Sequence, residues 1–99
     1  MPPILTKEQV REMFDYIPYA GTLTKQTKGT SRKPITSRFV HIRIDGKVYN
    51  YTTASIIWLY MTGDWHPYVQ RHDNIERRKQ KLPPVYTNNK WYNFTVKRA

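Results

Sequence analysis

The sequence predicts a small α+β fold, because segments with helical and strand periodicity follow one another along 99 residues. Apolar residues recur at helical spacing over residues 6–17 and 53–61. Between them, residues 38–44 and 47–52 alternate in polarity around Asp45-Gly46, a dipeptide that favours a two-residue type I′ turn. We therefore expect an N-terminal helix, a small antiparallel sheet with an Asp-Gly hairpin, a packed second helix and an irregular C-terminal segment.

The length of the chain supports one hydrophobic core, so we expect a single domain over residues 1–99. Within it, residues 1–67 are expected to form a helix–hairpin–helix core and residues 68–99 a basic segment. Only 38% of the residues are hydrophobic, but 14% are aromatic, which predicts a core built from large rings. The absence of Cys excludes disulfides, a thiolate zinc site and a cysteine nucleophile.

The first expected helix begins after Thr6, because Thr6 and Gln9 have the spacing of a capping box. Its apolar stripe repeats at i, i+3, i+4 and i+7: Val10, Met13, Phe14 and Ile17. The helix should end before Pro18, since a residue that precedes proline avoids the α region. A turn at residues 19–21 and a short strand over residues 21–26 are expected next.

The predicted hairpin has one core face and one outer face. An Asp-Gly turn pairs Ile44 with Lys47, and the register that follows puts one set on the core face: Val40, Ile42, Tyr49 and Tyr51. The outer face, expected to meet solvent or nucleic acid, carries the remaining side chains: Phe39, His41, Arg43, Val48, Asn50 and Thr52. A lone His on such a face is not a typical metal site.

The second helix is expected to be capped by Thr52 or Thr53 and to end at Gly63. Farther along, residues 69–72 are expected to form a short strand. Residues 89–96 have the pattern of either a helical turn or a strand.

The distribution of charge predicts an anionic partner. The chain has 17 Lys and Arg against 7 Asp and Glu, a formal net charge of +10. Residues 1–23 are slightly acidic, whereas residues 24–62 hold seven basic side chains and one acidic one, and residues 63–99 hold eight and three. Nucleic acid, and DNA before RNA, is the first expectation, followed by an acidic protein surface and then anionic lipid.

The basic side chains of both blocks are therefore expected to contact phosphates: Arg32, Lys33, Arg38, Arg43, Arg71, Arg77, Arg78 and Lys79. His41 and Asn50 stand beside Arg43 on the outer face of the hairpin. We expect this face to enter a DNA groove, where Asn50 contributes to base reading.

The order of these segments resembles that of small phage HNH-type endonucleases. The run Leu5 to Tyr16 looks like their opening, Val40 to Tyr49 fits their central hairpin, and Ile56 to Pro67 is similar to the helix and Trp-Pro turn before their nuclease motif. The resemblance implies that a ββα-metal finger follows, in which His72 is the general base toward water and Asn89 is the structural Asn. In that family an Asp before this His and a helical Asn hold a divalent cation, Mg²⁺ or Mn²⁺, against the scissile phosphate. Asn93 matches the helical Asn, and Asp73, which follows His72, is the second ligand only if the protein is active.

The chain departs from this pattern at the metal site. Arg71 precedes His72 where the family has Asp, and a guanidinium repels a metal ion. Thr53 and Ala54 occupy the stretch where the family has a further His. We therefore expect a phage-type DNA-binding protein that has lost catalysis and needs no cofactor. An active metal-dependent HNH endonuclease is the alternative.

A second alternative is a phage protein that binds and inhibits an acidic host enzyme, with Tyr68, Tyr86 and Tyr92 as interface anchors. The longest apolar run, residues 56–61, is too short to span a membrane, and the N-terminus lacks the pattern of a signal peptide. We therefore expect no membrane partner, and a location in the cytoplasm of the host cell.

Overall fold

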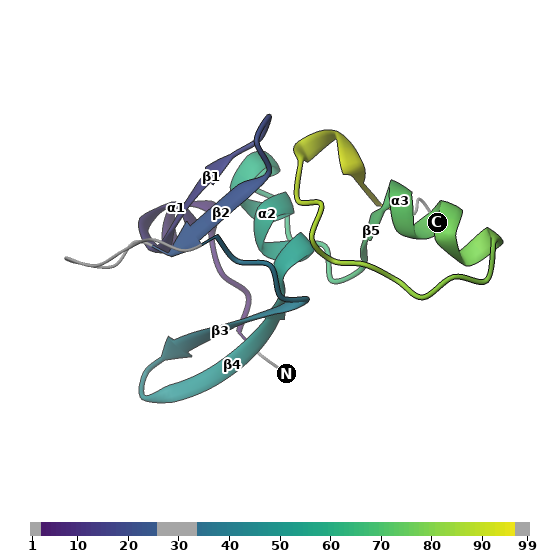
Figure 1. Ribbon diagram of the computed structural model, residues 1–99. Helices are drawn as coiled ribbons and strands as arrows, with labels where there is room; N and C mark the ends of the chain where they lie inside the picture. Colours follow the sequence, from purple (N-terminus) through teal and green to yellow (C-terminus); the bar gives the residue numbers. More distant parts are fainter. Residues whose placement is uncertain (1–2, 26–33, 97–99) are drawn as a thin grey trace.

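The computed structural model describes residues 3–25 and 34–96, and it confirms the α+β fold. In these ranges the chain forms three α-helices, a 3₁₀ turn and six strands (Figure 1). The strands pair in sequence order as β1–β2, β3–β4 and β5–β6, giving three separate two-stranded antiparallel sheets. None of the helices in the described ranges is long and apolar enough to cross a membrane.

The first helix, α1 (Lys7–Met13), has the predicted capping box. The Gln9 amide donates to the Thr6 hydroxyl at 3.1 Å, and the Thr6 amide donates to Oε1 of Gln9 at 2.8 Å. Two of the backbone donors that a helix start leaves free are thereby satisfied. Local chemistry alone therefore fixes where this helix begins.

The prediction that this helix continues toward Pro18 is wrong, because β1 (Phe14–Ile17) begins directly after Met13. β1 pairs with β2 (Thr22–Lys25), the strand predicted over residues 21–26. Phe14 and Tyr16 point into the core, whereas Ile17 is 41% exposed. Buried and more exposed side chains thus alternate along this segment, as in a strand. Ile17, the last residue of the apolar stripe at helical spacing, therefore does not lie on the buried face.

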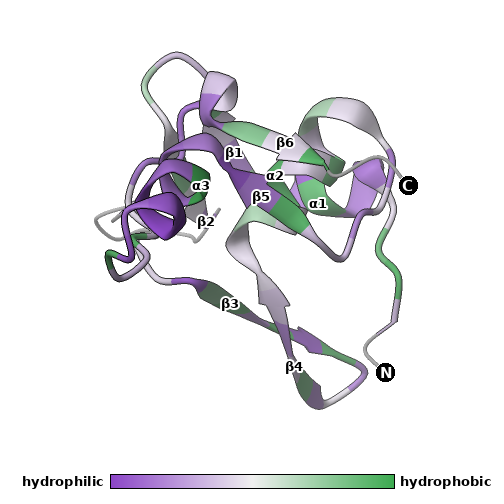
Figure 2. Ribbon diagram, turned by 90° about the vertical axis from the view of Figure 1, so that its right-hand side faces the viewer, coloured by the Kyte–Doolittle hydropathy of each residue, from purple (hydrophilic) through white to green (hydrophobic). Residues whose placement is uncertain are grey.

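The hairpin has the predicted register. β3 (Phe39–Ile44) and β4 (Lys47–Thr52) pair with Ile44 opposite Lys47 and Val40 opposite Tyr51. Asp45 and Gly46 both have positive φ, 50° and 79°, as a type I′ turn requires. The hairpin extends away from the rest of the chain in both views (Figures 1 and 2).

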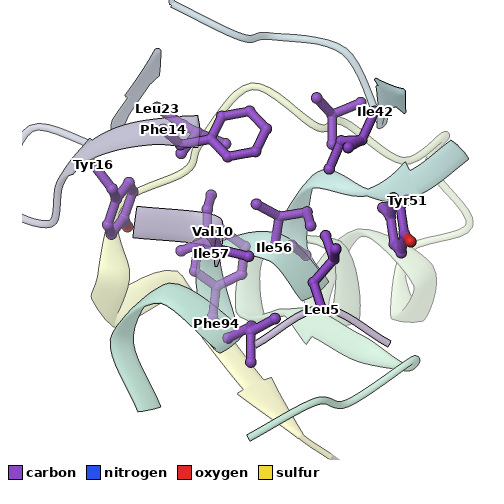
Figure 3. Close-up of a cluster of buried hydrophobic side chains, with 13 residues drawn as sticks. Leu5, Val10, Phe14, Tyr16, Leu23, Ile42, Tyr51, Ile56, Ile57 and Phe94 are labelled. Atoms are coloured by element: carbon purple, nitrogen blue, oxygen red, sulfur yellow. The ribbon is translucent and has the colours of Figure 1, made fainter. Parts of the chain in front are cut away.

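The second helix, α2 (Thr53–Thr62), is the centre of the core. It is buried around most of its circumference, and its buried residues are Thr53, Ala54, Ser55, Ile56, Ile57 and Leu59. Side chains from α1, β1, β3 and β4 gather around it (Figure 3). Gly63 caps its C-terminus as predicted, with φ of 82° and an amide that donates to the Leu59 carbonyl.

Thr52 occupies the N-cap position of α2, but its hydroxyl does not cap the helix. It donates to the Ser55 hydroxyl at 2.6 Å, and the Ser55 hydroxyl donates to the His66 carbonyl at 2.6 Å. Thr53, fully buried, donates to the Ser37 carbonyl at 2.8 Å. The polar groups at the start of α2 thus connect the helix to segments on both sides of it in the sequence.

The C-terminal segment contains β5 (Val69–Arg71), α3 (His72–Lys79), the 3₁₀ turn η1 (Trp91–Asn93) and β6 (Phe94–Val96). β5 pairs with β6, so α3 lies between two paired strands in the sequence. The family resemblance implies a ββα order, in which both strands precede the helix. The observed order is strand, helix, strand, so it differs from the ββα order. Residues 89–96 combine the two predicted alternatives, a helical turn and then a strand.

Candidate nucleic-acid interface and cationic pocket

The outer face of the hairpin presents polar and cationic side chains to solvent. His41, Arg43 and Asn50 are all exposed, and Nδ1 of His41 is hydrogen-bonded to Oδ1 of Asn50 across the two strands. Lys25 of β2 donates to the His41 carbonyl at 2.9 Å, which adds a cation beside this face. The Arg43 guanidinium is exposed and forms no hydrogen bond or ion pair with another described residue, so it is free to bind an external acceptor.

The cations that α3 carries have different surroundings. Nε of Arg77 donates to the Pro83 carbonyl at 2.6 Å, which fixes the chain that follows the helix. Lys79 forms an exposed ion pair with Glu76 at 3.3 Å. Arg78 is exposed and lines a pocket. Figure 2 shows that α3 is hydrophilic along most of its length.

This pocket, which we call the cationic pocket, has a volume of about 430 Å³. β5, α3 and the chain that follows α3 contribute most of its lining, and Arg38 reaches it from the residue before β3. Four cationic side chains line it: Arg38, Arg71, Arg78 and Lys81. No acidic side chain is among the described residues that line it, so the potential inside the pocket is positive.

Arg71 lies at the base of this pocket and is only 5% exposed. Nη2 of its guanidinium donates to Oδ1 of Asn89 at 2.7 Å, whereas its Nε is buried and has no hydrogen-bond partner among the described residues. The guanidinium also lies 5.1 Å from the ring centre of Phe94, the residue paired with Arg71 across β5–β6, and 5.4 Å from that of Tyr86. A buried N–H donor is costly unless an acceptor, such as a water molecule or an anion, satisfies it.

Burial lowers the pKa of the Arg71 guanidinium, and the neighbouring negative charge of Asp73 opposes that shift. The Asp73 carboxylate itself accepts from Nδ2 of Asn93 at 3.1 Å. The groups in direct contact with the Arg71 guanidinium are thus an amide oxygen and two aromatic rings, and Asp73 is the acidic group nearby.

The residues that the HNH resemblance implies for catalysis have other partners. Asp73 and Asn93 lie together, but they bind each other: the Asp73 amide donates to Oδ1 of Asn93 at 3.1 Å, and Nδ2 of Asn93 donates to the Asp73 carboxylate. His72 is the first residue of α3, and its side chain is exposed. Within the described ranges, no group of three or more His, Asp or Glu side chains is placed to hold a metal ion.

Asn89, which the resemblance assigns a structural role, is 2% exposed and connects three distant segments. Its carbonyl accepts from the Tyr16 hydroxyl at 2.5 Å, its Oδ1 accepts from Arg71, and its Nδ2 donates to the Ile35 carbonyl at 3.1 Å. Each of these bonds spans at least 18 residues of sequence. Asn89 therefore helps to hold Arg71 at the base of the cationic pocket.

The other predicted residues are distributed as follows. Arg32 and Lys33 lie outside the described residues. Tyr68 and Tyr92 are 82% and 70% exposed, whereas Tyr86 is half-buried with the guanidinium groups of Arg38 and Arg71 over its ring.

Two pocket residues, Asn74 and Lys81, were not expected from the sequence. Nδ2 of Asn74 donates to the Val85 carbonyl at 2.6 Å, and its Oδ1 accepts from the Val85 amide at 2.8 Å, which folds the chain after α3 back over the helix. Lys81 has a positive φ of 57° in the turn that makes this reversal. The Pro83-Pro84 pair signals a break in the helix, but no local pattern signals the return to Asn74.

No protein-family model, curated protein or solved structure in the three comparisons matches this chain. The HNH resemblance therefore stays a prediction drawn from the sequence.

Proposed function

We propose that this protein binds double-stranded DNA through the outer face of the β3–β4 hairpin. The observation that carries the proposal is an exposed two-stranded ribbon with Arg43, His41 and Asn50 on its outer face. The major groove of B-DNA is wide enough for such a ribbon, and arginine and asparagine are common donors to base edges. In this arrangement Arg43 contacts a phosphate or a guanine, and the His41–Asn50 pair meets the groove floor.

The distribution of charge supports the same proposal. Lys25 lies beside His41, and Lys47 is exposed at the tip of the hairpin. The exposed cations of α3 add a second positive surface on the same chain. Basic side chains that release counterions from DNA supply most of the affinity of such proteins.

We further propose that the protein does not hydrolyse DNA. The oxygen of Asn93 that a metal would need accepts from the Asp73 amide, and the Asp73 carboxylate is bound by Asn93. Arg71 places a buried positive charge beside them. These residues do not fit a divalent cation, so no metal-assisted step is assigned to them.

The test of DNA binding is the affinity for a fluorescent duplex of about 20 base pairs, measured by anisotropy between roughly 50 and 200 mM salt. We expect a steep, linear fall of log affinity with log salt. Arg43→Ala should weaken binding. If Arg43 contacts a phosphate the slope falls by about 1, and if it contacts a guanine the preference for that base is reduced instead.

The matched control is Lys7→Ala, which removes one positive charge from α1. It should change the affinity much less than Arg43→Ala, and the salt slope should stay the same. Equal effects of the two variants would assign binding to net charge rather than to the hairpin. Absence of salt-dependent binding would refute the proposal. Plasmid cleavage with Mg²⁺ or Mn²⁺ that is lost in His72→Ala would refute the absence of hydrolysis.

A second candidate function is binding to an acidic protein of a bacterial host. It is favoured by the exposure of Tyr68 and Tyr92, large amphipathic side chains beyond the needs of the core. Purification from a nuclease-treated bacterial lysate tests it. One stoichiometric acidic host protein that is retained by the wild type and lost in Tyr68→Ala would support this candidate over DNA binding.

A further inference from the structure

The cationic pocket has no role in the proposed groove contact, because its lining residues are not those of the outer hairpin face. We propose that it is a binding site for a phosphate monoester group. Such a group occurs on a free mononucleotide and at the 5′ end of a nucleic-acid strand. The chemistry recognised is the same in both cases.

The first argument is the free donor at the base of the pocket. Nε of Arg71 is buried without an acceptor among the described residues, while Nη2 of the same guanidinium is held by Asn89 at 2.7 Å. The Asn89 bond fixes the plane of the guanidinium and leaves Nε–H for a further acceptor. Arginine binds phosphate oxygens through paired N–H groups, and such charge-assisted bonds are among the strongest hydrogen bonds in proteins.

The second argument is the charge of the lining. Arg38, Arg78 and Lys81 surround the entrance and are exposed, and their side chains form no ion pair or hydrogen bond with other described residues. The guanidinium of Arg38 lies over the ring of Tyr86, but none of the three is paired with an acidic side chain among the described residues. Three such cations around a buried fourth repel one another, and an anion relieves this repulsion. A phosphate monoester carries close to two negative charges at neutral pH, against one for a phosphodiester.

The third argument is access. Arg71 is only 5% exposed, so a phosphate with one free end fits the approach to it better than an internal phosphodiester, which has a sugar on each side. A terminal phosphate is joined to sugar on one side only. The volume of about 430 Å³ lies within the range of small-molecule sites, and the apolar side chains of Ile75, Leu82 and Tyr86 offer a wall for the sugar or base.

The direct test follows the Nε–H resonance of Arg71 in the ¹H–¹⁵N spectrum of the full chain. Thymidine 5′-monophosphate should shift this resonance in a saturable manner, because its phosphate supplies the missing acceptor. Thymidine, which lacks the phosphate, should leave it in place. A resonance that responds to neither compound would overturn the proposal.

The second test uses variants of exposed side chains, which leave the core intact. Arg78→Ala should weaken thymidine 5′-monophosphate binding in calorimetry by about tenfold or more, as expected for a lost charged hydrogen bond. Lys79→Ala is the matched control, since Lys79 is the next residue of α3, is paired with Glu76 and does not line the pocket. It should bind the nucleotide as the wild type does, and equal losses in both variants would refute a specific site.

The two sources are separated with one blunt duplex that carries either a 5′-phosphate or a 5′-hydroxyl. A preference for the phosphorylated duplex that disappears in Arg78→Ala identifies the strand end as the source, whereas nucleotide binding without such a preference identifies the free nucleotide. Failure here is distinct from failure of the proposed function. If both duplexes bind equally and the nucleotide does not bind, the pocket proposal fails while DNA binding stands. If the nucleotide binds and neither duplex does, the pocket proposal stands and the proposal of DNA binding fails.

Discussion

Replacement of Asn93 with Ala should strongly destabilise the protein. Asn93 is 2% exposed, and its side chain makes three hydrogen bonds: its Oδ1 accepts from the Asp73 amide at 3.1 Å, and its Nδ2 donates to the Asp73 carboxylate at 3.1 Å and to the Asn88 carbonyl at 3.0 Å. These bonds join the start of α3 to η1 and to the chain before it. No other described side chain replaces Asn93 at the Asp73 amide.

The magnitude follows from the groups left without partners. Loss of the acceptor for the Asp73 amide leaves a donor in the first turn of α3 unpaired, as the loss of a capping side chain does, which costs about 1 kcal/mol. The half-buried Asp73 carboxylate and Asn88 carbonyl each lose a donor, at about 1 kcal/mol apiece. We therefore expect the free energy of unfolding to fall by about 3 kcal/mol, and the melting temperature by roughly 15 °C for a domain of this size.

The assay is urea unfolding followed by tryptophan fluorescence, because Trp91 lies in η1 and its ring packs on that of Trp58 at 5.1 Å. Tyr92→Ala is the matched control. Tyr92 is adjacent to Asn93 but 70% exposed, so its removal should change stability by less than about 0.5 kcal/mol.

Asn93→Asp distinguishes this structural role from the metal-ligand role that the sequence resemblance implies. The variant keeps an acceptor for the Asp73 amide, but it loses both donated bonds and sets a second carboxylate beside that of Asp73. We expect a loss of stability at least as large as for Asn93→Ala, with no recovery on addition of Mn²⁺. A loss below about 1 kcal/mol in Asn93→Ala, or stabilisation of Asn93→Asp by Mn²⁺, would refute the reasoning.

Two further predictions concern the core and its turns. Gly21→Ala should destabilise the protein by at least about 2 kcal/mol more than Gly46→Ala, as measured by thermal unfolding. Both glycines have positive φ, but a Cβ at Gly21 would lie 2.6 Å from the Lys90 backbone nitrogen, whereas nothing lies within 4 Å of one at Gly46. Equal losses of stability would contradict the close approach at Gly21. Burial raises the pKa of the Tyr16 phenol, so the unfolded chain ionises first and stability should fall as the pH rises above about 10. Tyr16→Phe should cost about 1 kcal/mol at pH 7, because the Asn89 carbonyl loses its donor, and should flatten this alkaline fall in urea midpoints; an unchanged slope would contradict the assignment.

Features set by neighbouring residues were predictable from the sequence. The capping box of Thr6 and Gln9, the glycine cap at Gly63 and the full register of the hairpin around Asp45-Gly46 follow from residues a few positions apart. In each case the backbone donors or the turn geometry leave few alternatives.

The end of α1 was not predictable, because Phe14 satisfies both periodicities. It lies four residues after Val10 on a helical stripe and two residues before Tyr16 on a strand face. Pairing of β1 with β2 decides in favour of the strand, and a periodicity within one segment contains no information about that partner.

The cationic pocket was only partly predictable, since its walls come from distant segments. Arg71 was expected to contact phosphate from the surface, but pairing of β5 with β6 buries it beside Phe94. Its position at the base of the pocket depends on Asn89, and the entrance depends on Arg38, 33 residues before Arg71 in the sequence. Such a site exists only once the chain has folded.

The position of Asn89 also determines the order in which the molecule can be completed during synthesis. Tyr16 is synthesised early, but its hydroxyl can donate to the Asn89 carbonyl only after 73 further residues have been added. The Ile35 carbonyl and the Arg71 guanidinium also form their bonds only once Asn89 is present. The residues of the hairpin and α2 are synthesised before residue 89, whereas the guanidinium of Arg71 gains its hydrogen bond only once Asn89 is present. The cationic pocket is therefore completed only after residue 89 has been synthesised, later than the residues of the hairpin and α2.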